Sequence, residues 1–249
     1  MDDERINQNE ISDENSEKGK ELLTKSEPLK EKKRLNPKKT DVKRLVGMAV
    51  FSALAYAVTF VFRIPVAFLT FDAKDAVLTV ASFIYGPIAA LIMAFIPAFI
   101  EFITISQTGF WGFLMNYLSS ACFAFTASLI YKKKRSFSGA VIGIYSAIVI
   151  TTLFMIPMNI LITPIYTKTS AADVIKILPT LLLPFNFAKA LMNGAITMFL
   201  YKPVSTAMKR AGFIKGNVDF RFSKNSVITL IAGGITLISA IVIFIILKA

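Results

Sequence analysis

Residues 182–201 read LLPFNFAKALMNGAITMFLY, and this stretch decides what kind of protein the chain is. It is long and apolar enough to cross a bilayer as a helix, yet it carries Asn186, Lys189 and Asn193. Their i, i+3, i+7 spacing places all three on one helix face. A lysine near the bilayer centre costs about 2.5–3.5 kcal/mol even on a lenient scale. We interpret this face as a ligand site. The alternative is that Lys189 reaches the nearer interface and the two amides serve packing.

The composition is that of a membrane protein. The 249 residues are 55% hydrophobic, with a mean hydropathy of +0.61, which excludes an ordinary soluble domain. The chain has no histidine and one cysteine, Cys122, so no Cys/His metal site or disulfide framework is expected. The net charge of +12 comes from short basic clusters beside apolar runs, where topology signals belong. We therefore expect no nucleic-acid partner.

The chain divides into three parts. Residues 1–41 are charged and poor in aromatics, which predicts a disordered cytoplasmic tail. Residues 42–212 predict a six-helix membrane domain, and residues 213–249 predict a cytoplasmic linker and an extra transmembrane helix. The fold class is therefore all-α integral membrane, with expected spans at 45–62, 75–85, 88–105, 113–131, 139–162, 182–201 and 226–247.

Basic clusters precede the first span and follow the fourth and the sixth. The positive-inside rule then places the amino terminus in the cytoplasm of a multi-pass cell-membrane protein. With that topology, polar residues of several spans gather toward the outer side. A hydrogen-bonding organic ligand fits such a cluster. The candidate binding residues are Thr70, Asp75, Trp111, Gly112, Phe113, Asn116, Asn159, Asn186, Lys189 and Asn193. Glu101, a carboxylate inside the third span, is a possible ion-pair partner of Lys189.

Catalytic signatures are missing from the sequence. There is no histidine base, HExxH helix, GxSxG elbow or P-loop. An enzyme is therefore not expected, although a membrane enzyme or redox protein that holds a flavin or quinone is kept as a second hypothesis. Ala49, Ala53 and Ala57 recur every four residues in the first span and form a stripe that lets another helix approach closely. That helix could belong to this chain or to another subunit.

Five pieces of the sequence resemble a known family, the substrate-binding (S) components of energy-coupling factor (ECF) vitamin transporters, from about residue 43 to 202. Within it, the riboflavin-specific branch is the most similar. The pieces are the alanine stripe, FDAKD at 71–75, GFWGFLMN at 109–116, the Pro157-Met158-Asn159 turn and LPFNFAK at 183–189. The stripe is weakly specific, and the GFWGFLMN and LPFNFAK pieces are moderately specific. The tail and the seventh span lie outside the resemblance.

The resemblance implies a six-helix protein that binds one vitamin near the outer surface and has no ATPase of its own. It implies riboflavin as the transported ligand, held by Asn159, Asn186 and Lys189, with no cofactor. The loop after the first span is expected to act as a lid, and the alanine stripe to dock on a membrane scaffold subunit that carries two ATP-binding cassette ATPases. Another vitamin, such as folate or thiamin, is the alternative ligand.

Overall fold

The computed structural model describes residues 39–106, 108–211 and 224–248. Most of the predicted tail 1–41, and the predicted linker between 213 and 223, lie outside the described residues. The elements are α2 (Lys39–Val61), β1 (Ile64–Val66), β2 (Leu69–Phe71), α3 (Lys74–Tyr85), α4 (Pro87–Thr104), α5 (Gly109–Lys133), α6 (Phe137–Thr167), α7 (Ala171–Ile177), the π-helical turn η1 (Leu178–Leu182), α8 (Leu183–Arg210) and α9 (Lys224–Lys248).

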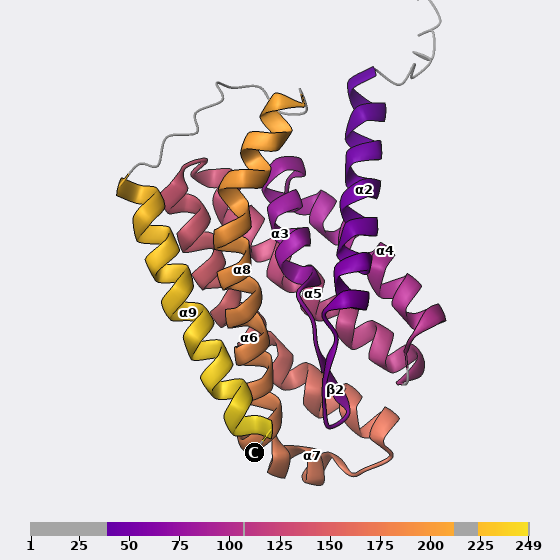
Figure 1. The fold of residues 1–249 in the computed structure, drawn as a ribbon. Coiled ribbons are helices and arrows are strands. Elements are labelled where there is room, and N and C mark those ends of the chain that lie inside the picture. The colour runs from indigo at the N-terminus through magenta and orange to yellow at the C-terminus, as the bar shows by residue number, and fades with distance from the viewer. Residues whose placement is uncertain (1–38, 107, 212–223, 249) are drawn as a thin grey trace, which may run out of the picture. The chain divides into compact units, whose positions relative to one another are not determined.

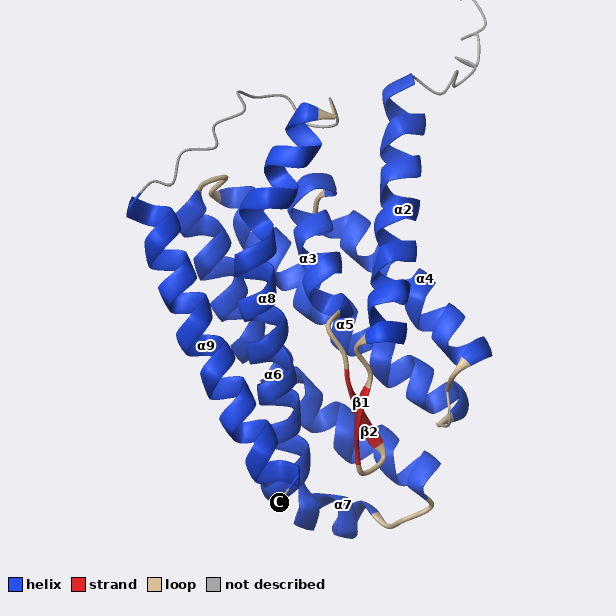
Figure 2. Ribbon diagram, in the orientation of Figure 1, coloured by secondary structure: helices blue, strands red, loops and turns tan. Residues whose placement is uncertain are grey.

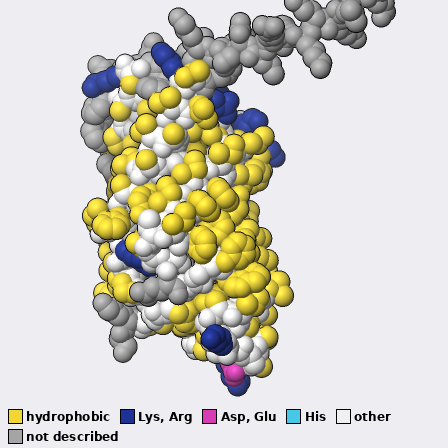
Figure 3. Space-filling model, turned by 90° about the vertical axis from the view of Figure 1, so that its right-hand side faces the viewer, with side chains coloured by type: hydrophobic (Ala, Val, Ile, Leu, Met, Phe, Trp, Pro, Cys, Tyr) yellow, Lys and Arg dark blue, Asp and Glu magenta, His cyan; other side chains and the backbone are white. Residues whose placement is uncertain are grey.

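The predicted all-α membrane fold is confirmed (Figure 1, Figure 2). Five segments of the described chain are long and apolar enough to cross a membrane: Val42–Val61, Pro87–Thr104, Gly109–Lys133, Ser138–Thr167 and Ala171–Arg210. The face drawn in Figure 3 is hydrophobic over most of its height, as a lipid-facing surface requires. With 12 residues, α3 is only roughly 18 Å long, too short to span alone, and most of its side chains are buried among its neighbours.

Three predicted boundaries are wrong. The fourth span was expected to begin at residue 113, after a short loop at 107–112, but α5 already begins at Gly109. Pro157-Met158-Asn159 was expected to form a turn, but it lies inside α6, which continues to Thr167. Neighbouring helices can satisfy the backbone groups that a proline frees within a membrane protein, so the helix need not end there. Finally, α8 continues past Tyr201 to Arg210.

The connection between the first two helices is a β-hairpin rather than an irregular loop. Strands β1 and β2 pair antiparallel, with Ile64 opposite Phe71 and Val66 opposite Leu69. Ala67, between the strands, has a positive φ of 50°. Val66 and Phe71 are buried, so the hairpin is packed against the helices and does not project freely into solvent.

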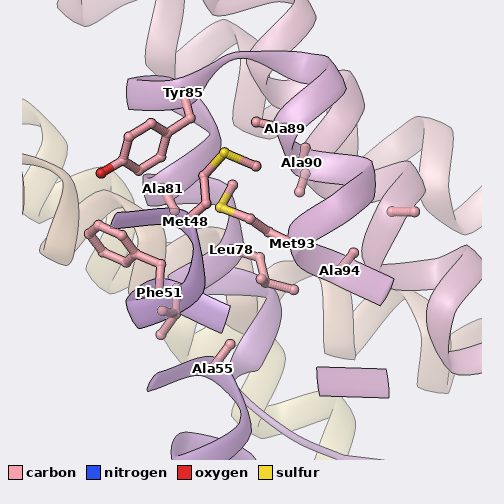
Figure 4. Close-up of a cluster of buried hydrophobic side chains, with 13 residues drawn as sticks. Met48, Phe51, Ala55, Leu78, Ala81, Tyr85, Ala89, Ala90, Met93 and Ala94 are labelled. Carbon is pink, nitrogen blue, oxygen red and sulfur yellow. The ribbon is translucent and has the colours of Figure 1, made fainter. Parts of the chain in front are cut away.

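Small side chains bring α2, α3 and α4 close together (Figure 4). Ala55, Ala81 and Ala90 are fully buried in this cluster, where Met48 and Met93 fill the space between the helices. The hydroxyl of Ser52 donates hydrogen bonds to the carbonyls of Met48, at 3.0 Å, and of Met93, at 3.3 Å. This face of α2 therefore belongs to the core.

The alanine stripe lies on the other face of α2. Ala49, Ala53 and Ala57 are all exposed. The alternative that the stripe packs against a helix of this chain therefore does not hold within the described residues. The stripe is left as an open, small-residue surface on the membrane-facing side of α2.

Candidate functional site

A cavity of about 670 Å³ opens between the hairpin and helices α4, α5, α6 and α8. That volume lies within the usual range for small-molecule sites. Seven of the ten predicted binding residues line it: Thr70 from the hairpin, Gly112, Phe113 and Asn116 from α5, Asn159 from α6, and Asn186 and Lys189 from α8. The cavity thus gathers polar groups from segments that are far apart in the sequence.

Lys189 is buried and ion-paired, and its partner differs from the one predicted. Its Nζ lies 2.7 Å from Oδ2 of Asp72 and donates a hydrogen bond to it. Glu101 instead pairs with Lys74, at 2.7 Å between Nζ and Oε1. The expected Glu101–Lys189 pair is therefore wrong, because the FDAKD segment supplies a partner to each of them.

Asp72 connects the two ion pairs. It stands between β2 and α3, outside the membrane-spanning helices, and its Oδ2 also lies 3.8 Å from Nζ of Lys74. Burial alone would raise the pKa of the Asp72 carboxyl, but the ammonium groups of Lys189 and Lys74 outweigh that effect and hold the pKa below its ordinary value. The carboxylate is thus ionised and fixes the Lys189 ammonium at the wall of the cavity.

Three asparagine amides are oriented by hydrogen bonds to the protein. Nδ2 of Asn116 donates to Oε2 of Glu101 at 2.6 Å. Nδ2 of Asn186 donates to the Leu182 carbonyl at 2.7 Å, and Nδ2 of Asn159 donates to the Met155 carbonyl at 2.7 Å. An amide has two N–H donors and one oxygen acceptor. Within the described part of the chain each amide donates one such bond, so its second N–H is available to a ligand in an orientation that the first bond fixes.

Three of the predicted binding residues do not line the cavity. Asn193 is fully buried and serves the fold: its Oδ1 accepts the Ala76 N–H at 2.9 Å, and its Nδ2 donates to the carbonyls of Asp72, at 2.9 Å, and Lys189, at 3.0 Å. Trp111 is 37% exposed and packs on Phe110. Asp75 is buried on α3 outside the cavity, and its Oδ1 has no hydrogen-bond partner among the described residues.

Among the lining residues that the sequence did not place in the candidate site, four add a charge or an aromatic wall. Asp72 and Glu101 line the cavity as carboxylates, Arg63 stands where the chain enters the hairpin, and Phe185 adds an aromatic wall. Asp72 and Glu101 carried a signal, since each is a charge beside or inside an apolar span. Phe185 carried none, because an aromatic residue in a membrane helix is equally typical of packing.

Comparison with known proteins agrees with this arrangement. The family model for the substrate-specific component of ECF transporters matches residues 43–204. The riboflavin transporter RibU of Staphylococcus aureus (strain TCH60) is 29% identical over 178 residues, covering 68% of this chain and 93% of that protein. A solved structure of the S component of a bacterial ECF transporter superposes with a TM-score of 0.59 at 27% identity, covering 68% of this chain and 99% of the other.

The family match takes in the hairpin, the three amides, Lys189 and the carboxylates that hold it. It ends before α9, which begins at Lys224. The matched proteins are transporter components, and this chain is accordingly a transport component of the cell membrane rather than an enzyme. The chain belongs to the family of substrate-specific components of ECF transporters.

Proposed function

We propose that this chain captures riboflavin in the cavity and delivers it to an ATP-driven ECF module. The observation that carries the proposal is the convergence of Asn116, Asn159, Asn186 and Lys189 on one cavity. These residues come from three helices, and all four fall in the part of the chain that matches the family. The name of the Staphylococcus aureus relative supports riboflavin as the vitamin.

The chemistry of the lining suits a flavin. A flavin ring is planar and carries carbonyl oxygens, ring nitrogens and one N–H, so it needs several donors and at least one acceptor at fixed angles. The three oriented amides and the Lys189 ammonium provide such donors. Phe113 and Phe185 offer apolar walls against which a flat ring can pack.

The hairpin is suited to act as a lid over this ligand. Pro65, Leu69 and Thr70 of the hairpin line the cavity. Its two strands have three residues each, and a two-stranded hairpin of this size is only marginally stable by itself. Opening it would expose the ligand without unpacking the helices. We place this side of the molecule outside the cell, in accordance with the basic clusters at the opposite helix ends.

Coupling to energy is proposed to occur through α2. The sequence has no phosphate-cradling loop, so the driving force must come from another subunit. The exposed alanine stripe offers a smooth surface on which a helix of a scaffold subunit can lie closely. The scaffold would in turn carry the two ATP-binding cassette ATPases.

The test is equilibrium binding of riboflavin to the purified full chain in detergent, with thiamin and folate as competing candidates. Asn186→Ala removes one oriented amide and is expected to weaken riboflavin binding by about 1–3 kcal/mol. Phe187→Ala is the matched control, because this neighbouring side chain is 37% exposed and does not line the cavity. Binding of thiamin or folate in place of riboflavin would overturn the choice of vitamin. Equal riboflavin affinity in Asn186→Ala and in the parent would overturn the site.

A further inference from the structure

Helix α9 lies beyond the family match and packs along α8, on the side of the bundle away from α2 (Figure 1). Ala240 is buried, and the hydroxyls of Tyr145 on α6 and Thr236 on α9 lie 3.0 Å apart. At Gly233, an added Cβ would come within 3.2 Å of the Phe199 ring on α8. The opposite face of α9, with Ile235 and Ile245, is exposed as lipid contact requires. The helix is thus fitted to this bundle along one face.

The carboxyl-terminal end of α9 reaches the hairpin. Ile243, Phe244 and Leu247 pack against a buried cluster formed by Val66, Phe71, Phe185 and Ala188. The Phe71 ring contacts two other rings, with its centroid 5.7 Å from Phe185 and 5.3 Å from Phe244. One neighbour belongs to α8 and the other to α9. Helices α8 and α9 therefore both contact this hairpin side chain.

Phe71 is directly linked to the cavity wall. It is the last residue of β2, and residues on both sides of it, Thr70 and Asp72, line the cavity. Asp72 is also the carboxylate that fixes Lys189. A displacement of Phe71 would therefore move part of the cavity wall as well as the end of strand β2.

We propose that Phe244 is a positioning residue for the ligand site: through Phe71, α9 clamps the β1–β2 hairpin against α8 and so slows the opening of the cavity. A hairpin of two three-residue strands depends on such anchoring contacts for its stability. Without the Phe244 ring, Phe71 would keep its contact with Phe185 and lose the one with α9. The identity of the ligand rests on the proposed function, whereas the clamp itself does not.

The first test needs no ligand. Amide hydrogen exchange of residues 64–71 is measured on the full-length protein for Phe244→Ala, for Phe244→Tyr and for the control Ile245→Ala, whose native side chain is 60% exposed. We expect about tenfold faster exchange in Phe244→Ala, since an aromatic pair of this kind is worth about that factor. Phe244→Tyr, which retains the ring, and Ile245→Ala should both exchange at about the parent rate. Exchange in α4 and α5 should not change.

The second test uses riboflavin and reports on function. The dissociation rate of bound riboflavin, followed by its fluorescence after dilution, should rise about tenfold in Phe244→Ala and return to the parent value in Phe244→Tyr. Should Phe244→Ala not fold, Phe244→Leu takes its place. Leucine keeps apolar packing but has no ring, so amide exchange of the hairpin is expected to be about threefold faster than in the parent.

Two results would overturn the clamp. One is amide exchange of the hairpin at the parent rate in folded Phe244→Ala, or in Phe244→Leu where that variant replaces it. The other is that Ile245→Ala speeds hairpin exchange as much as the loss of the Phe244 ring does. If the variant without the ring shows faster hairpin exchange but releases riboflavin at the parent rate, the claim that the clamp slows ligand release is wrong. If the parent binds no riboflavin while hairpin exchange still accelerates in Phe244→Ala, the clamp stands and the proposed vitamin is wrong.

Discussion

The ion pair between Lys189 and Asp72 predicts a specific pattern of stability in a double-mutant cycle. Both side chains are buried, and the charged atoms lie 2.7 Å apart. At an effective dielectric constant of about 20 their attraction is roughly 6 kcal/mol, most of which offsets the cost of removing two charges from water. Removing one partner leaves the other charged and buried, at a cost of about 3–5 kcal/mol.

We therefore expect Lys189→Met alone to lower the unfolding temperature in detergent by on the order of 10 °C. Asp72→Asn alone should also destabilise, because it leaves the Lys189 ammonium buried without its partner. The double variant removes both charges and keeps the shapes, so its stability should recover to within about 1–2 kcal/mol of the parent. Lys176→Met is the control, since Lys176 pairs with Asp173 at the surface and the pair is exposed.

The assay is thermal unfolding of the four proteins in the same detergent, analysed as a cycle. A Lys189→Met protein as stable as the parent would refute the ion pair as described. A double variant no more stable than Lys189→Met would refute the argument that the loss comes from a buried Asp72 carboxylate deprived of its nearest cation. Because Lys189 also lines the cavity, the recovered double variant should still bind riboflavin more weakly than the parent.

Three further predictions concern the fold, the coupling and the topology. Asn193→Ala should lower the free energy of unfolding by about 1–3 kcal/mol, because it leaves the buried Ala76 N–H and the Asp72 carbonyl without their partner. Thermal unfolding measures this loss, and an unchanged midpoint would contradict the prediction. Ala53→Trp should retain riboflavin binding in detergent but abolish uptake in cells that contain the scaffold and ATPases, whereas uptake at the parent rate would remove α2 as the docking face. A cysteine in place of Thr108 should react with a membrane-impermeant thiol reagent in intact cells, and a cysteine in place of Ser136 should not. The reverse pattern would show that the topology is the opposite of the one proposed.

The helices could be predicted because each apolar run is bounded by charges or turn residues, and all but the short run at α3 are long enough to span. The hairpin could not. Its strands are three residues long, Pro65 interrupts the first, and the pairing depends on burial of Val66 and Phe71 against helices distant in the sequence. The length of α8 was also missed, because the expected span stopped where the apolar run ends, at Tyr201, and the helix continues through the basic residues that follow.

The candidate site could also be predicted only in part. Spacing placed Asn186, Lys189 and Asn193 on one helix face, and that much is correct. Seven residues along a helix amount to roughly 10 Å, however, so Asn193 lies about two turns from Asn186, outside the cavity lining, and binds the backbone there. The partner of Lys189 depends on how two segments 117 residues apart pack together. Spacing within one helix carries no information about that contact.

The most direct test of the central claim is the ligand content of the protein purified from cells grown with riboflavin. Riboflavin capture predicts the absorption spectrum of a bound flavin, at one flavin per chain in the parent and in Lys176→Met, and at a reduced content in the double variant Asp72→Asn/Lys189→Met. A colourless parent protein that also fails to bind added riboflavin in a direct titration would contradict riboflavin capture by this chain.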